Sequence, residues 1–255
     1  MAIKLDLQKV YDRVSWDFIH SVFLRLGFNE VFANWILNCM SSVSFEVLVN
    51  GGKSESFKLS RGLRQGDSLS PNLFILGQEI LSRMLDTKLR QRNICGIRTS
   101  KSGPIIMNVM YADDIILFSK ASKKDATTIN HILNKYCSWS SQQVNREKSG
   151  ILFSNHTQSN TRRSLKSILQ MKSLKKDTIY LGAPLLLSRA PAKDFFYLQS
   201  KLEAKLTGWR TKCLLWAGRR TLICSVAQSI PNYSMSTFNI PKKVWENLDS
   251  LSRKF

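Results

Sequence analysis

Two adjacent carboxylates, Asp113 and Asp114, lie between the apolar runs Ile105–Met110 and Ile115–Phe118. Successive residues of a strand point to opposite faces, so an unbroken strand would bury one of the two charges. This pattern predicts an antiparallel hairpin with the pair at its turn. Aspartate is a common turn former, but tight hairpin turns favour Asn-Gly or Asp-Gly. Adjacent carboxylates also repel each other unless a cation lies between them.

A third carboxylate, Asp6, ends a predicted strand that begins at Ile3. It is either an ordinary strand-end aspartate or part of a cation site. If its strand lies next to the hairpin, three carboxylates meet at one edge of the sheet and offer the oxygen ligands that Mg²⁺ prefers. Two such ions about 4 Å apart can activate one oxygen and stabilise the departing one in phosphoryl transfer.

The elements around these carboxylates mix strands with helices. Ser15 is a predicted N-cap, and Ser70-Pro71 is predicted to open a second helix with Ser70 as its cap. Asn50-Gly51-Gly52-Lys53 is a hairpin signal between two short strands. Apolar residues at helical spacing are expected to form the core, namely Phe18, Val22, Leu26, Phe74, Ile80, Leu81, Met84, Leu85, Ile129, Ile132, Leu133 and Tyr136.

The later part of the chain is mainly helical by the same criterion and strongly basic. Predicted helices cover Asp194–Thr207, Gly218–Ser229 and Lys242–Arg253. Residues 151–255 carry 18 Lys and Arg against 5 Asp and Glu, and the whole chain has a formal net charge of +20. This excess predicts a polyanionic partner, either nucleic acid or an anionic membrane surface. A membrane partner is disfavoured because neither a bilayer-spanning run nor a basic amphipathic anchor helix is found.

The five cysteines are scattered and form no CxxC pair, which argues against a disulfide framework and a zinc module. The N-terminus carries charges where a signal peptide needs its apolar stretch. We therefore expect an intracellular protein, nuclear or cytoplasmic, and not a secreted one. Its oligomeric state stays open.

Four ordered motifs resemble the reverse transcriptase of non-LTR (LINE-type) retrotransposons, particularly those of plants. They are Lys4-Leu5-Asp6 with Tyr11-Asp12-Arg13-Val14, then Arg61–Asp67 with Leu69-Ser70-Pro71, then Tyr111-Ala112-Asp113-Asp114, then Asn145 with Lys148-Ser149. Further matches begin at Tyr180-Leu181-Gly182 and at Ala217-Gly218-Arg219. The resemblance extends almost end to end, with departures at Ser68, Ser141 and Trp216, where the family usually has Pro, Gly and a small polar residue.

The resemblance implies an α+β fold, with a polymerase right-hand palm in residues 1–153 and a mainly helical, thumb-like region in residues 154–255. The polar stretch 154–161 is the expected boundary. Asp6 follows only five residues, so we expect the fingers to be missing, together with basic groups that would grip a triphosphate.

The resemblance also assigns the chemistry, RNA-directed DNA synthesis from dNTPs on an RNA template with a DNA primer. Asp6 and Asp113 would be the main ligands of two Mg²⁺ ions, with Asp114 beside them and Mn²⁺ as a substitute metal. Lys148 would protonate pyrophosphate, although a surface lysine is the simpler interpretation.

Four residues would contact the incoming nucleotide. Tyr11 would exclude a 2′-hydroxyl, with core packing as its structural alternative. Gln65 would contact the nucleotide or its template partner, and Gly66 would let the backbone approach closely. Arg64 would meet phosphate, unless it is a solvated loop arginine.

Two other functions stay open. The first is a catalytically dead retroelement fragment that only binds nucleic acid. The second is a viral RNA-dependent RNA polymerase, which usually carries Gly-Asp-Asp in place of the Ala112-Asp113-Asp114 sequence found here.

Overall fold

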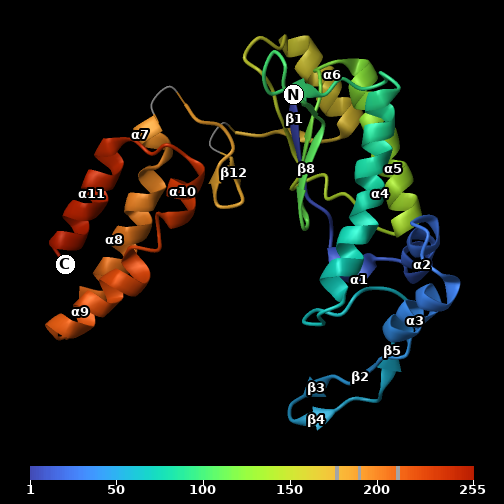
Figure 1. Cartoon of the computed structure of the whole chain (residues 1–255), viewed down its shortest axis with the longest axis horizontal. Coiled ribbons are helices and arrows are strands. Elements are labelled where there is room, and N and C mark those ends of the chain that lie inside the picture. Colours follow the sequence, from blue (N-terminus) through green and yellow to red (C-terminus); the bar gives the residue numbers. More distant parts are fainter. Residues whose placement is uncertain (176–177, 189–190, 211–212) are drawn as a thin grey trace. The chain divides into compact units, whose positions relative to one another are not determined.

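The structure, a computed structural model, describes residues 1–175, 178–188, 191–210 and 213–255 (Figure 1). The chain divides into two compact units, Met1–Leu174 and Lys175–Phe255. This division falls later than the expected boundary between residues 153 and 154. The reason is that α6 (Ser159–Leu169) buries Leu165 and Leu169 in the core of the first unit.

A five-stranded sheet is the frame of the first unit, in the order β11-β10-β1-β9-β8. Its central strand β1 (Ala2–Leu5) pairs antiparallel with β9 (Asp114–Phe118) and β10 (Gly150–Leu152). At the edges, β8 (Asn108–Tyr111) pairs antiparallel with β9, and β11 (Lys172–Ser173) pairs parallel with β10. The predicted neighbourhood of the first strand and the acidic hairpin is therefore confirmed.

The hairpin itself is shorter than predicted. Its strands begin at Asn108, whereas Ile105–Ile106 form a separate strand, β7, that pairs with β6 (Ile97–Arg98). Residues 105 and 106 are therefore hydrogen-bonded to an upstream strand instead of to β9.

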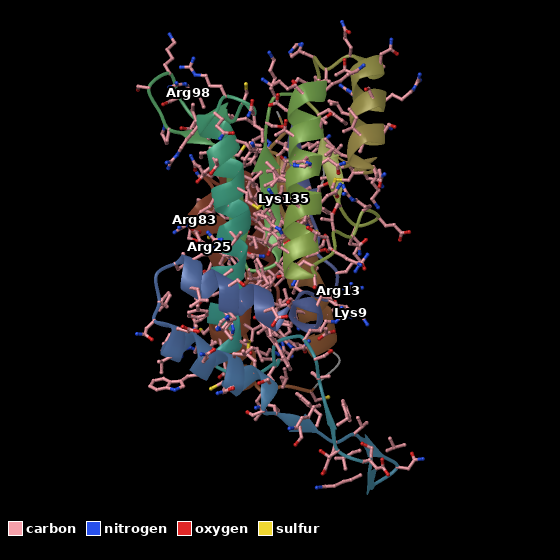
Figure 2. The ribbon with its side chains drawn as sticks, turned by 90° about the vertical axis from the view of Figure 1, so that its right-hand side faces the viewer. Lys9, Arg13, Arg25, Arg83, Arg98 and Lys135 are labelled. Carbon is pink, nitrogen blue, oxygen red and sulfur yellow. The ribbon has the colours of Figure 1, made fainter. Side chains whose placement is uncertain are left out.

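Long helices pack against the sheet: α2 (Trp16–Arg25), α4 (Ser70–Arg90), α5 (Lys123–Ser140) and α6. Ser15 caps α2 as predicted, because its hydroxyl accepts the Phe18 N–H. The predicted core is buried apart from Leu26, Ile80 and Met84, which are half-buried. Figure 2 shows basic side chains at the outer faces of this unit, among them Arg25, Arg83, Arg98 and Lys135.

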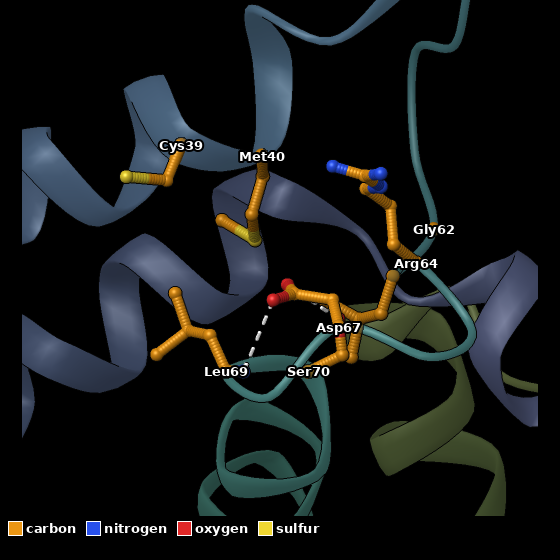
Figure 3. A pocket seen from close by; sticks show the side chains of 8 residues that line it. Cys39, Met40, Gly62, Arg64, Asp67, Leu69 and Ser70 are labelled. Carbon is orange, nitrogen blue, oxygen red and sulfur yellow. Dashed lines mark hydrogen bonds between the residues drawn. The ribbon is translucent and has the colours of Figure 1, made fainter. Parts of the chain in front are cut away.

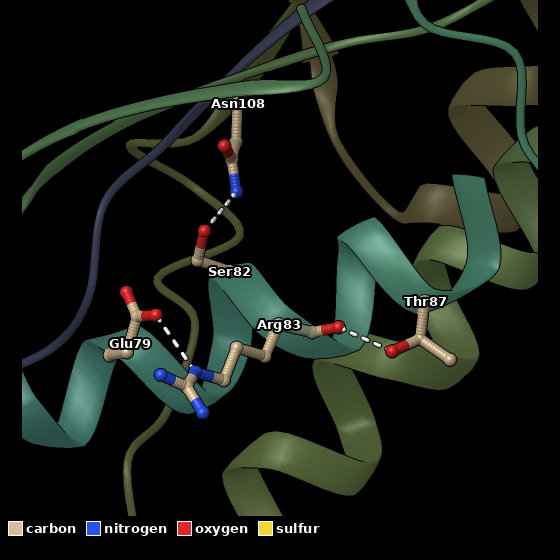
Figure 4. A network of polar contacts seen from close by, with 5 residues as sticks. All are labelled: Glu79, Ser82, Arg83, Thr87 and Asn108. Carbon is tan, nitrogen blue, oxygen red and sulfur yellow. Dashed lines mark hydrogen bonds and ion pairs between the residues drawn. The ribbon is translucent and has the colours of Figure 1, made fainter. Parts of the chain in front are cut away.

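The start of α4 differs from the prediction. Leu69 is the N-cap and Ser70 is the first helical residue, and the Asp67 carboxylate holds the segment just before the helix. It accepts the Leu69 N–H at 3.2 Å and the Ser70 hydroxyl at 3.1 Å. Further along α4, the Ser82 hydroxyl accepts a hydrogen bond from the Asn108 side chain of β8 at 3.0 Å, which ties helix to sheet (Figure 4).

Two further helices and two short ladders complete the first unit. The helices are α1 (Val10–Arg13) and α3 (Glu30–Ser41), and the strands are β2 (Ser44–Phe45), β3 (Leu48–Val49), β4 (Gly52–Lys53) and β5 (Phe57–Lys58). The predicted hairpin turn is confirmed: Asn50 and Gly51 both have positive φ, 50° and 84°, as a type I′ turn requires.

The second unit is mainly helical, as predicted. Its elements are β12 (Ile179–Tyr180), β13 (Ala183–Pro184), α7 (Pro191–Asp194), α8 (Phe196–Arg210), α9 (Trp216–Leu222), the π-helical turn η1 (Ile223–Ala227), α10 (Asn232–Thr237) and α11 (Lys242–Arg253). α11 matches its predicted bounds, and the helix expected over Gly218–Ser229 begins two residues earlier and becomes π-helical at Ile223. The core is small: Phe195, Leu198, Leu202, Leu206, Ala227, Val244 and Leu248. Within the described ranges of both units, no helix has the length and apolar character needed to cross a bilayer.

Candidate active site at one end of the five-stranded sheet

Asp6 follows β1 directly, and its backbone is held by a loop more than a hundred residues away. Its N–H donates to the Ser149 hydroxyl at 3.0 Å, and its carbonyl accepts the Asn145 N–H at 2.8 Å. The next residue, Leu7, forms an isolated antiparallel bridge with Val144. The backbone of Asp6, from which the carboxylate projects, is therefore fixed on both its N–H and its carbonyl side.

The acidic hairpin turns at Ala112-Asp113, because the last paired residues are Tyr111 and Asp114. Ala112 has φ 49°, in the left-handed region that tight turns require. Asp113 is exposed at the tip, whereas Asp114 is the first residue of β9. The turn thus contains one of the two predicted aspartates, and the other begins the returning strand.

The register between β1 and β9 brings Asp6 and Asp114 to the same end of the sheet. The last pair of that ladder is Leu5 with Ile115, so Asp6 and Asp114 are the next residues of the two strands. Lys4 lies diagonally across from Asp114, with 3.9 Å between its Nζ and Oδ1. Asp6 and Asp114 thus lie at one end of adjacent strands, beside a lysine.

The three candidate ligands at this end of the sheet, Asp6, Asp113 and Asp114, are all carboxylates, and such oxygen ligands suit a hard divalent cation. In the described part of the chain, however, no three side chains of His, Cys, Asp or Glu are grouped closely enough to hold a metal ion. The residues fit Mg²⁺ by type and by strand register, and metal binding would need their side chains to turn toward one another.

The loop that supports Asp6 also carries Lys148. Its N–H donates to the Asn145 side chain at 3.1 Å, and its own side chain is exposed. Arg146 anchors the same loop by donating to the Leu169 carbonyl at 2.6 Å and to Asn130 at 3.0 Å. In the fourth motif, Asn145 organises the turn and Ser149 accepts the hydrogen bond from the Asp6 N–H. Lys148 is the exposed cation of this motif.

Tyr11 lies in α1, five residues after Asp6. Its ring stacks on Phe74 with 5.5 Å between centroids and an interplanar angle of 24°. The side chain is partly buried against the core. The stacking on Phe74 supports the core-packing interpretation of Tyr11, and the same contact fixes the orientation of the ring.

Gly62 lies within the second motif, where the sequence alone indicates no role for it. Its N–H donates to the Val14 carbonyl at 2.8 Å, and its carbonyl accepts the Trp16 indole N–H at 2.6 Å. At φ 95°, a Cβ here would lie 3.0 Å from the Asp12 carbonyl oxygen and 3.1 Å from that of Tyr11. Only glycine fits, and it locks the second motif onto the segment that follows Asp6.

Arg64, Gln65 and Gly66 lie further along this locked segment, and all three are exposed. Gly66 has φ 88°, and a Cβ would meet nothing within 4 Å, so its backbone is open to approach. A small pocket adjoins the segment (Figure 3). It is lined by Cys39, Met40, Gly62, Leu63, Arg64, Asp67, Leu69 and Ser70.

A helix-backed antiparallel sheet, with carboxylates where a hairpin turn meets the end of the neighbouring strand, defines the palm of a right-hand polymerase. Residues 1–185 match the family described as reverse transcriptase (RNA-dependent DNA polymerase), and the chain belongs to this family.

Similar proteins agree with this assignment and narrow it to non-LTR retrotransposons. The chain is 31% identical over 117 residues to the Pol polyprotein of the retrotransposable element R2DM of Drosophila melanogaster, covering 46% of this chain and 10% of the relative. It is 24% identical over 231 residues to the 149 kDa protein of transposon TX1 of Xenopus laevis, covering 89% and 17%.

Among solved structures, Candida albicans telomerase bound to a fragment of telomeric RNA aligns with 98% of this chain and 43% of its own, with a TM-score of 0.48 and 16% identity. The chain spans between 10% and 55% of the length of the curated relatives it matches.

Proposed function

We propose that the chain is the polymerase region of a retroelement reverse transcriptase, which copies RNA into DNA by nucleotidyl transfer. The observation that carries this proposal is the shared end of β1 and the β8–β9 hairpin. Asp6, Asp113 and Asp114 follow or begin strands at this one end of the sheet, in a chain of the reverse transcriptase family.

In the proposed reaction, the primer 3′-oxygen forms a bond to the α-phosphorus of a dNTP while the bond to the bridging oxygen breaks and pyrophosphate leaves. Asp6 and Asp113 would hold two Mg²⁺ ions, with Asp114 beside them, and Mn²⁺ would substitute. Bound metal would activate the attacking oxygen and stabilise the leaving one. The chain's own contribution is to fix the carboxylates, through the β1–β9 register and the Asp6–Ser149 hydrogen bond.

The exposed Arg64-Gln65-Gly66 segment would receive the nucleotide, and the exposed Lys148 would donate a proton to pyrophosphate. Tyr11, held by Phe74, would lie against the sugar and exclude a 2′-hydroxyl. If so, Tyr11→Ala raises the use of ribonucleotides, while Phe74→Leu loosens the ring and has a smaller effect. Unchanged selection between ribonucleotides and deoxynucleotides in Tyr11→Ala would contradict the role of Tyr11 alone.

The partners proposed are an RNA template and a DNA primer. Residues 175–255 carry 14 Lys and Arg against 5 Asp and Glu, which suits a phosphate backbone. Binding should therefore weaken steeply as salt rises.

The test is extension of a DNA primer on an RNA template by the purified chain, with Mg²⁺ or Mn²⁺. Asp113→Asn should lower the rate by at least about a hundredfold, because a metal ligand supplies several kcal/mol of transition-state stabilisation. Asp86→Asn, on α4, is the matched control and should extend normally. Equal extension by Asp113→Asn and the unchanged chain would refute the assignment.

A second candidate function is nucleic-acid binding without catalysis. It is favoured by the Lys4 ammonium, which lies 3.9 Å from Asp114 where a metal cation would have to compete. Binding of a primer–template duplex without extension in either metal would select this function over the first.

A further inference from the structure

The most exposed large apolar side chains of the described chain lie together at the start of α9. The exposed fractions are 82% for Leu215 and 81% for Trp216. α9 has seven residues, and none of them is buried. A helix this short is marginal by itself, and most helical stability in proteins comes from packing an apolar face. A partner that covers these two side chains would supply that missing burial.

The surroundings of α9 indicate the chemistry of that partner. Arg219 is tied to the end of the chain: its guanidinium donates to the Phe255 carbonyl at 3.0 Å and lies 5.7 Å from the centre of the Phe255 ring. This contact anchors α9 within its unit, at one end of the helical group in Figure 1. The next residue, Arg220, is exposed. The helix thus combines an exposed indole with an exposed guanidinium in a unit that carries a strong basic excess.

We propose that Trp216 is a stacking platform for an unpaired base of a single-stranded nucleic acid, with Leu215 beside the base and Arg220 on an adjacent phosphate. An aromatic ring next to a cation is the usual combination for sequence-tolerant binding of single strands. Bases inside a duplex are already stacked on both faces, so an unpaired base gains most from the indole. This inference rests on the proposed function in one respect, namely that the partner is a nucleic acid.

The site adds a contact to a basic region and does not replace the aspartates. It requires no catalysis, so binding alone can test it.

The experiment measures the affinity of the full chain for a short fluorescein-labelled RNA, for the same DNA sequence, and for an oligomer of equal length with abasic sugars. Trp216→Ala should weaken binding of the two base-containing strands by about 5- to 100-fold, the range measured for single stacking residues. The abasic strand keeps its phosphates and should bind both proteins equally. Trp216→Phe should restore most of the loss.

Two further variants separate stacking from charge. Arg220→Gln should weaken all three strands alike and lower the salt slope by about 0.7, the contribution of one phosphate contact on a single strand. Trp139→Ala is the matched control, since it removes a 48% exposed indole of α5 in the first unit that already lies under the Lys135 ammonium. It should leave every affinity within about twofold.

The outcomes are distinct for the two proposals. If the unchanged chain binds no strand at all, the proposed function fails with this inference. If it binds and Trp216→Ala behaves like the unchanged chain, only the stacking site is refuted. Binding to phosphatidylserine vesicles that depends on Trp216, with oligonucleotide affinity unaffected, would instead identify a membrane surface as the occupant.

Discussion

The two units of this chain differ in the size of their apolar cores. In the first unit, Leu117 and its neighbours in the central strands are fully buried in a large core. The core of the second unit is small, although both units expose large side chains, such as Trp35 at 62% in the first and Phe196 at 57% in the second. The carboxylates lie at the end of the well-packed frame, and the sparsely packed unit has the higher basic excess for its length, with 14 Lys and Arg against 5 Asp and Glu in residues 175–255. Rigidity is therefore concentrated where the geometry of the proposed chemistry requires it.

The largest expected difference is in stability after core truncation. Leu117→Ala should lower the free energy of unfolding of the first unit by about 3–4 kcal/mol, and Leu202→Ala in α8 should cost the second unit about 2–3 kcal/mol. The second cost is smaller because a small core relaxes more easily around a cavity. Hydrogen exchange resolved by segment, with urea denaturation, measures both. Equal loss of protection in both units after Leu117→Ala would show that they unfold as one.

A smaller effect is expected at the glycine that locks the site. Gly62→Ala combines a positive φ with contacts of 3.0 and 3.1 Å to backbone oxygens, and should cost about 2 kcal/mol. Gly66→Ala has the same backbone strain but open space, and should cost about 1 kcal/mol. Thermal unfolding of the two variants gives the comparison. Equal destabilisation of Gly62→Ala and Gly66→Ala would show that the close backbone contacts at Gly62 add nothing to the cost of the substitution.

These glycines also indicate what the sequence could and could not predict. The acidic hairpin, the Ser15 cap and the Asn50-Gly51 turn follow from signals within a few residues. The cap and the turn are confirmed, and the hairpin is present but shorter than predicted, with Asp113 alone of the two aspartates in its turn. Gly62 and Ser149 were missed as site residues because their partners are 46 and 143 positions away, where local pattern carries no information.

The boundary between the two units and the start of α4 also depend on contacts that the local sequence does not reveal. Whether α6 belongs to the first unit depends on Leu165 and Leu169 finding space in a distant core, and its own sequence does not reveal that. At α4, the Ser70 hydroxyl donates to the Asp67 carboxylate instead of capping the helix, and Leu69 is the N-cap. The roles of Tyr11, Arg64, Gln65, Gly66 and Lys148 stay predictions.

Alkaline pH should destabilise the first unit through Tyr136, whose burial beside Phe18 raises the pKa of its phenol above the usual range. Below pH 10 both folded and unfolded states keep the proton. Above it, the unfolded phenol ionises while the buried one stays neutral, so stability falls by up to about 1.4 kcal/mol per pH unit. Tyr136→Phe should lose about 1 kcal/mol less than the unchanged chain between pH 10 and 11.

The control for that titration lies in the second unit. Tyr233→Phe makes the same chemical change at a half-exposed phenol and is the comparison variant. Urea denaturation of the three proteins at pH 8, 10 and 11 measures the difference. An alkaline loss that persists in Tyr136→Phe would assign it to other groups.

The smallest expected effects compare matched surface ion pairs, one in each unit. Glu79 pairs with Arg83 in α4 at 2.9 Å (Figure 4), and Lys242 pairs with Glu246 in α11 at 3.5 Å; both pairs have i,i+4 spacing. With the acid N-terminal to the base, the α4 pair has the better orientation, so Glu79→Gln should cost about 0.3–0.5 kcal/mol and Glu246→Gln about 0.2 kcal/mol.

For oligonucleotide binding the order of the two variants should be the opposite, with the larger effect from Glu246→Gln. Glu246→Gln removes an acid from the basic unit and should strengthen oligonucleotide binding at low salt by a small factor, while Glu79→Gln leaves it unchanged. Fluorescence anisotropy at two salt concentrations measures this, because a gain that disappears at high salt is electrostatic. Equal gains from both variants would mean that total charge, and not the second unit, determines binding.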